Sequence, residues 1–298
     1  MAQRVWSEAG LFRNSRSYYR LHTEIDVLRG AGHKEELEIV LEKEMDEADF
    51  SALIYDEPSD TFKLHSSVYL EEDNAPWLID LFQASVALQA AEAEEISQRV
   101  GAKLHAARAL SEHPDLGPRV EPHMLIESTA DYFNLESAKP SHWEGNEEWN
   151  EVNWIMERQA QEWQKSDGNS IGAEFYWAPD QDQSIKLNIT SQEPHKELGN
   201  GLHFTLTIPL NMNTRHIAYM ALELNEHERS NWLKTHMIGS WCNHDQMLAF
   251  RLFIPNKLYQ ERVLHELAVT MAARAIWANE FFFVKKAQAE ANRKASLH

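Results

Sequence analysis

The chain has 298 residues, of which 43% are hydrophobic and 25% are charged, a balance typical of a globular protein and too apolar for a disordered one. The 47 acidic and 28 basic residues give a formal net charge of −19, which repels phosphate backbones and anionic lipid headgroups. We therefore expect neither nucleic acid nor a membrane as a partner, and the length allows two domains that each bury a core.

The start of the chain and its cysteine content predict a cytoplasmic protein. Residues 1–20, MAQRVWSEAGLFRNSRSYYR, contain no apolar core of the secretory kind, and no apolar run approaches the roughly 20 residues that span a bilayer. The single cysteine, Cys242, cannot form an internal disulfide, which is typical of a reducing compartment.

The N-terminal half is predicted to contain two strands between two helices. A helix is expected over His33–Met45, followed by strands at Phe50–Tyr55 and Thr61–Leu70 that a polar turn separates. Pro76 suits the first turn of a long helix whose apolar positions run from Trp77 to Leu104.

A domain boundary is expected where prolines accumulate. Four prolines lie between Pro114 and Pro140, around a short helical piece at Met124–Phe133. We therefore predict an N-terminal α+β domain at residues 1–118, a proline-containing connector at 119–140 and a C-terminal α+β domain at 141–298.

The C-terminal half shows the order α-β-β-β-α-β-β-α. Apolar residues recur at helical spacing over Ser141–Gln164 and alternate with polar ones in the strands that follow. Asn213 or Thr214 can cap the second helix. The remaining elements are expected at Ile171–Trp177, Ser184–Thr190, Leu202–Pro209, Asn211–Asn231, Thr235–Trp241, Met247–Pro255 and Leu258 to about Ala289.

The two halves share a partial pattern. Sliding the chain by 186 residues places Tyr55 on Trp241, Phe62 on Leu248, Leu64 on Phe250 and Val68 on Ile254. This match indicates either an internal duplication or the pattern that any two strand–strand–helix units share. The fold class that we expect is α+β, with two related domains that each hold an antiparallel sheet and flanking helices.

The tetrapeptide Cys242-Asn243-His244-Asp245 raises the question of a reactive thiol. It lies between two apolar strand patterns, and Asn and Asp tolerate turn geometry, so a hairpin turn accounts for it without chemistry. A nucleophile and its base are usually distant in sequence and meet in space. We interpret the tetrapeptide as a turn.

The 15 histidines raise the question of a metal. The zinc motif His-Glu-x-x-His fails at His227, where the second histidine is Asn231, and at His265, where it is Val269. Five histidines could still converge in space, namely His65, His203, His216, His236 and His244. No residue is assigned a catalytic, cofactor-binding or metal-binding role, and no cofactor is expected.

Residues 141–289 carry a resemblance to a known fold. Their element order, together with Gly239–Cys242, Leu248–Asn256 and Arg274–Trp277, resembles type III secretion chaperones and related bacterial chaperone-like domains of uncharacterised members. The resemblance implies acidic proteins that dimerise and hold extended partner segments on sheet surfaces. Because this chain is about twice as long, it implies the fold in tandem, with an intramolecular pseudo-dimer or a homodimer as the assembly.

We therefore expect a non-enzymatic protein-binding or chaperone-like protein that holds partner polypeptide segments on a sheet surface. The residues expected to contact the partner protein are Phe204, Leu206, Phe250, Leu252 and, off the main apolar stripe of its helix, Trp154. The first four fit a plain core equally well. Two alternatives stay open: a hydrolase or metal-dependent enzyme with a site assembled from dispersed His, Asp and Glu, and a structural or regulatory subunit of a larger assembly.

Overall fold

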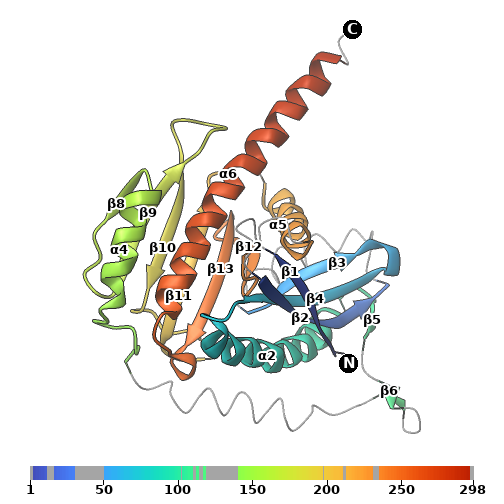
Figure 1. The fold of residues 1–298 in the computed structure, drawn as a ribbon. Helices are drawn as coiled ribbons and strands as arrows, with labels where there is room; N and C mark the ends of the chain where they lie inside the picture. The colour runs from blue at the N-terminus through green and yellow to red at the C-terminus, as the bar shows by residue number, and fades with distance from the viewer. Residues whose placement is uncertain are drawn as a thin grey trace.

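The computed structural model describes residues 3–11, 17–30, 50–101, 103–109, 112–113, 117–118, 140–196, 198–210, 213–230 and 235–295. It confirms the predicted α+β class, with two antiparallel sheets of five and six strands packed with helices (Figure 1). The predicted helix at His33–Met45 and the helical piece at Met124–Phe133 lie outside these residues.

The first sheet has the strand order β1-β2-β4-β3, with β5 pairing the end of β2. The 3-10 turn η1 (Glu57–Ser59) joins β3 to β4, and α2 (Ala75–Gly101) packs on one face of the sheet. The strands are β1 (Gln3–Leu11), β2 (Ser17–Arg29), β3 (Ala52–Asp56), β4 (Thr61–Leu70) and β5 (Ala107–Arg108). Sequence patterns predicted β3, β4 and α2, whereas β1 and β2 were not anticipated.

The second sheet has the order β12-β13-β11-β10-β9-β8. Its strands are β8 (Glu162–Gln164), β9 (Ser170–Tyr176), β10 (Ser184–Thr190), β11 (Gly201–Ile208), β12 (Ser240–His244) and β13 (Met247–Pro255). The helices of this half are α4 (Glu148–Gln159), α5 (Thr214–Arg229) and α6 (Val263–Ala295). The remaining short elements are β6 (Glu112–His113), β7 (Gly117–Pro118) and η2 (Asn256–Leu258).

The first helix of the C-terminal half is shorter than predicted. It ends at Gln159, because Ala160 is extended and the Gln161 amide donates to Glu174 O at 2.7 Å. Trp163, expected on the helix, therefore lies in β8 and pairs with Ala173 of β9. At the start of α5 the side chain of Asn213 accepts from His216 N, which confirms one of the two predicted caps.

The order of four strands recurs in the two sheets. The path β1-β2-β4-β3 in the first sheet has the same connectivity as β10-β11-β13-β12 in the second. In each sheet a long helix follows the last hairpin, α2 after β4 and α6 after β13 (Figure 1).

The segment that leads into β12 joins the two sheets. Met237 and Ser67 of β4 exchange two backbone hydrogen bonds, of 2.7 and 3.0 Å, and the Gly239 amide donates to Phe50 O at 3.1 Å. This pairing explains why the strand predicted at Thr235–Trp241 begins β12 only at Ser240. Gly239 has a φ of 96°, and a Cβ there would lie 2.3 Å from Arg251 O, so the crossing needs glycine.

Helix α6 lies across one face of the second sheet and then extends beyond it (Figure 1). Its stretch Val263–Gln288 is long and apolar enough to cross a membrane by length and composition, in contrast to the expectation from the sequence. Half of that apolar window is buried inside the protein, and core helices of soluble proteins meet the same criteria.

Candidate functional site

Charged side chains gather on the face of the first sheet that is turned away from α2. Antiparallel pairing sets Glu24 of β2 opposite His65 of β4, and His22 opposite Ser67. Residues two apart in a strand share a face, so these side chains point the same way. We call the following set the junction cluster: His22, Glu24, Asp56, Lys63, His65 and Arg229.

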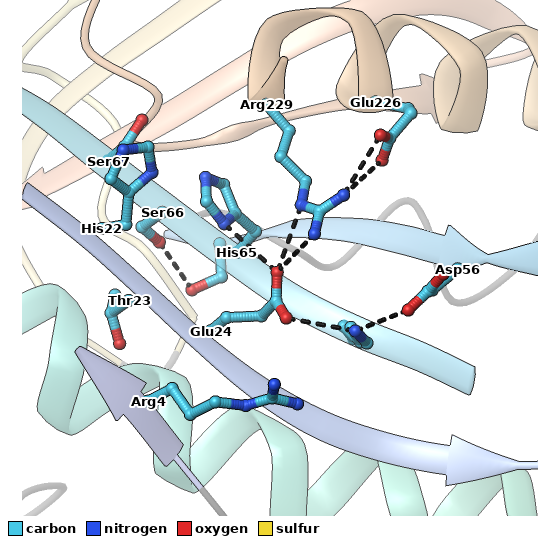
Figure 2. Close-up of polar contacts among 12 residues, drawn as sticks. Arg4, His22, Thr23, Glu24, Asp56, His65, Ser66, Ser67, Glu226 and Arg229 are labelled. Atoms are coloured by element: carbon cyan, nitrogen blue, oxygen red, sulfur yellow. Dashed lines mark hydrogen bonds and ion pairs between the residues drawn. The ribbon is translucent and has the colours of Figure 1, made fainter. Parts of the chain in front are cut away.

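Glu24 is the centre of the junction cluster. Its carboxylate accepts from Lys63 Nζ at 3.2 Å and from Arg229 Nε and Nη2 at 3.1 Å each. Figure 2 shows Arg229 between the carboxylates of Glu24 and Glu226, with His65 beside Glu24. Glu24 Oε2 lies 3.7 Å from His65 Nδ1, which is too long for a hydrogen bond.

The junction cluster has no net charge, because its two carboxylates are balanced by two cations. Lys63 Nζ also contacts Asp56 at 2.7 Å, so that two carboxylates face one ammonium and one guanidinium. Glu24 and Lys63 are 3% and 6% exposed. Buried charges are stable only when paired in this way, since desolvation of each ion costs several kcal/mol.

The pairing shifts the pKa values of the charged groups. Burial by itself raises the pKa of Glu24, but His65, Arg229 and Lys63 together outweigh it and lower the pKa to about 2. Burial by itself lowers the pKa of Lys63, but the contacts with Asp56 and Glu24 outweigh this effect and raise the pKa above its ordinary value. Both groups are therefore ionised across the physiological range.

The two histidines of the cluster are neutral. Burial, aided by the nearby Arg20 charge, lowers the pKa of His22 to about 3, and burial lowers that of His65 to about 4 against the opposing effect of Glu24. The ring of Trp6 stacks on His22 at a centroid distance of 4.7 Å. None of the four ring nitrogens has a hydrogen-bond partner within the described part of the chain.

A carboxylate beside an imidazole can act as a general base, but the junction cluster gives a substrate no access. His22 and His65 are 2% and 0% exposed, and Glu24 is held by two cations. In the described ranges, no group of three or more His, Cys, Asp or Glu side chains is arranged to hold a metal ion.

The arrangement joins the end of α5 to the first sheet. Arg20, which is fully buried on β2, donates to the carbonyls of Glu228 and Arg229 at 2.9 and 3.0 Å and to Ser67 Oγ. These carbonyls lie at the C-terminal end of α5, where a cation interacts favourably with the helix dipole.

The same turn of α5 is bound to the second sheet by Glu228. Its carboxylate accepts from Arg274 Nε and Nη2 at 2.8 and 2.7 Å and from the Trp241 indole at 2.6 Å. Both ends of this ion pair are almost completely buried, and the Arg274 guanidinium lies over the Phe250 ring.

One turn earlier, Asn225 connects an edge strand of each sheet. Its amide donates to Leu53 O of β3 at 3.0 Å and to Trp241 O of β12 at 3.2 Å, and it accepts from Trp241 N at 2.9 Å. Asn225 is fully buried. The last two turns of α5 therefore hold both sheets at once.

The residues predicted to bind a partner fall in two places. Phe204, Leu206, Phe250 and Leu252 are 0–3% exposed and belong to the core beneath α6. In this structure they form no open surface: on β11 the alternate residues His203, Thr205 and Thr207 are the half-buried ones, and β13 is buried on both faces at Ala249 and Phe253. Trp154 is 56% exposed on α4, with the Arg158 guanidinium 3.6 Å over its ring.

The histidine and cysteine candidates are dispersed. Cys242, Asn243 and His244 end β12, and the turn to β13 is Asp245-Gln246, both at positive φ as a two-residue hairpin loop requires. Cys242 is buried. His236 accepts from Tyr69 N and contacts Glu266 at 3.3 Å, whereas the His203 ring lies tilted against Phe253 of the second sheet.

Of the junction cluster, only His65 was among the residues considered from sequence. The signal for His22 and Glu24 is the alternation in Ser17–Arg29, where Arg20, His22, Glu24 and Asp26 take every second place. Charged residues at alternate positions of a strand normally indicate a solvated face, so this pattern alone does not predict a buried cluster.

A scan against protein-family models, a search of curated proteins and a search of solved structures each returned no match for this chain.

Proposed function

We propose that this protein is a non-enzymatic, cytoplasmic protein-binding or chaperone-like protein. Its two halves pair within one chain, and a sheet surface holds extended segments of partner polypeptides. The observation that carries the proposal is the junction at α5, where the corresponding edge strands β3 and β12 are bound to one residue, Asn225.

A tandem duplication accounts for this arrangement. The two sheets share four strands in the same connectivity, each followed by a long helix. A shift of 186 residues carries β4 from Thr61–Leu70 onto 247–256, which is β13 with one residue added. Two like units with an internal contact would replace the two subunits of a homodimer.

The outward face of β9, β10 and β11 is the surface that we assign to the partner. Side chains on this face are exposed or half-buried and polar, while the alternate residues face the core. Backbone and polar side chains on such a face suit an extended segment that varies in sequence. The face is formed by Gly172, Glu174, Tyr176, Lys186, Asn188, Thr205 and Thr207.

The junction cluster supports a structural role over a catalytic one. Its ionised groups are paired with one another, and its imidazoles are neutral and buried. The groups of a working acid–base site are placed where a substrate can contact them. We therefore propose no reaction for the cluster.

Site-specific photocrosslinking tests the assignment of the surface. A photoreactive amino acid at Asn188 or Lys186 should give covalent adducts with cellular polypeptides in living cells, since both positions are exposed on the assigned face. The same amino acid at Glu95 of α2, which is also exposed, is the matched control and should give none. Adducts at Glu95 as strong as at Asn188, or none at Asn188, would contradict the proposal.

A further inference from the structure

Strand β1 is a long sheet edge that no described residue covers. The edge strands β3 and β12 are both bound by Asn225 of α5. At the far edge of the second sheet, β8 has only three residues. By contrast, β1 has nine residues without proline or a bulge, and it pairs on one side only, with β2. Long open edges are the places where strands of other chains add.

The second half of the molecule shows what is missing at this edge. Strand β10 occupies the same place in the repeated order as β1, and it pairs on both sides, with β11 and with β9. In the described part of the first sheet, nothing takes the place of β9. Val5 is accordingly 56% exposed, although valine usually lies within a sheet.

The charges on β1 favour pairing with a copy of itself. Arg4 and Glu8 lie on the same face of the strand, on either side of Trp6, and their side chains are 59% and 56% exposed. Charged residues usually keep an edge from pairing because identical charges meet. Here the charges are opposite and equally distant from Trp6, so an antiparallel copy brings Arg4 opposite Glu8 twice.

We propose that two copies of this chain pair edge to edge through β1, antiparallel, with a two-fold axis at Trp6. The two first sheets then form one continuous sheet, with Arg4 of each copy opposite Glu8 of the other and Val5 opposite Ser7. A contact of one strand per copy belongs to the small interfaces, below about 1,200 Å² in total, so the dimer forms and dissociates with concentration.

Charge exchange tests the register. Sedimentation of the full chain over a concentration series should give a monomer–dimer equilibrium. Arg4→Glu or Glu8→Arg alone sets like charges opposite each other at both ends and should raise the dimer Kd at least about tenfold. The double variant Arg4→Glu with Glu8→Arg restores both pairs and should return the Kd close to that of the unmodified chain.

Two matched variants serve as controls. Arg29→Glu makes the same charge change at a residue that also contacts Asp26 and is equally exposed, but lies on β2, and Glu95→Arg does so on α2. Neither should change the Kd. A chain that is monomeric at every concentration overturns the proposal, and so does a dimer that responds equally to the controls or is not restored by the double variant.

A disulfide gives a second measurement that does not depend on charge or on how well the charge variants fold. Val5→Cys together with Ser7→Cys should yield a dimer linked across the two-fold axis under mild oxidation, because the proposed register sets these positions opposite each other. Cys242 is buried and does not compete. A failure of the double-cysteine chain to crosslink at concentrations where the unmodified chain is dimeric overturns the register.

Discussion

Glu24 shows how one buried carboxylate can determine stability. It is held by Lys63 and Arg229, and removing one partner of such a set leaves the opposite charges buried and uncompensated. Glu24→Gln keeps the size of the side chain, so its effect reports the charge alone. We expect a loss of about 3 kcal/mol in the free energy of unfolding, measured by urea denaturation at pH 7.

The matched change on the surface is Glu95→Gln, which breaks the exposed ion pair with Arg99 on α2. Surface pairs contribute little, so this variant should lose no more than about 0.5 kcal/mol. Equal effects of the two substitutions would show that the burial of Glu24 has no energetic consequence.

His22 and His65 make the protein sensitive to acid. Their folded pKa values are about 3 and about 4, below the ordinary value of 6.5, so the unfolded chain binds more protons between pH 6.5 and 3. Stability is therefore complete above pH 6.5 and is lost as the pH falls. Between pH 7 and pH 5, each histidine should lower the free energy of unfolding by about 2 kcal/mol, measured from the shift in the urea midpoint.

The variant His22→Phe isolates one of these contributions. Phenylalanine preserves the stack on Trp6 and cannot bind a proton. Between pH 7 and pH 5, its free energy of unfolding should fall by less than that of the unmodified chain. The difference should be about the 2 kcal/mol expected for one histidine. A parallel pH dependence of the two proteins would mean that His22 does not titrate within this window.

At the scale of elements, α5 is the part of the second half that also organises the first. Asn225 satisfies backbone groups of β3 and β12 with three hydrogen bonds. Asn225→Leu fits the size of the site but leaves these groups buried without a partner. We expect a loss of about 3 kcal/mol in the free energy of unfolding, and faster amide hydrogen exchange in both β3 and β12.

Asn213→Ala on the same helix is the control for Asn225→Leu. It removes the cap of α5 at its exposed end, away from both strands, and should cost about 1 kcal/mol. Exchange in β3 should be unchanged in this variant. If it accelerates as much as in Asn225→Leu, the effect comes from the helix as a whole and not from the shared contact.

The elements differ in how far sequence could predict them. Strands such as β10 and β11, with Leu187 and Leu206 facing the core and Lys186 and Thr205 facing out, follow the alternation that sequence analysis recognises. Strand β2 alternates as well, yet its charged face is buried by a helix end from position 229. Glu24 and Arg229 are 205 residues apart, so no local pattern can join them.

For the whole molecule, the two sheets should unfold as one unit. The last turn of α5 is bound to the first sheet by Arg20, and Glu228 of the same turn binds Trp241 of the second sheet and Arg274 of α6. Exchange of the slowest amides in β4 and in β13 should therefore give the same free energy. Arg20→Met should separate the two, so that β4 opens at a free energy about 2 kcal/mol below that of β13.

Arg99→Met, which removes a half-buried guanidinium of α2 that lies away from α5, is the control and should leave the two sheets coupled. The measurement is hydrogen exchange followed by mass spectrometry, with peptides that cover β4 and β13. Separate free energies in the unmodified chain would contradict the expected coupling.

The backbone pairing of Ser67 with Met237 also has a consequence for how the protein is made. These residues are 170 positions apart (237 − 67), and a ribosome needs roughly 10–30 s for such a length. During that interval β4 of the nascent chain can pair with β3 over residues 61–65, but Ser67 lacks the backbone partner that Met237 later supplies. Each synthesis of the chain therefore passes through an intermediate with an unpaired strand segment, which is prone to aggregation. Slower translation after residue 70 lengthens the lifetime of this intermediate.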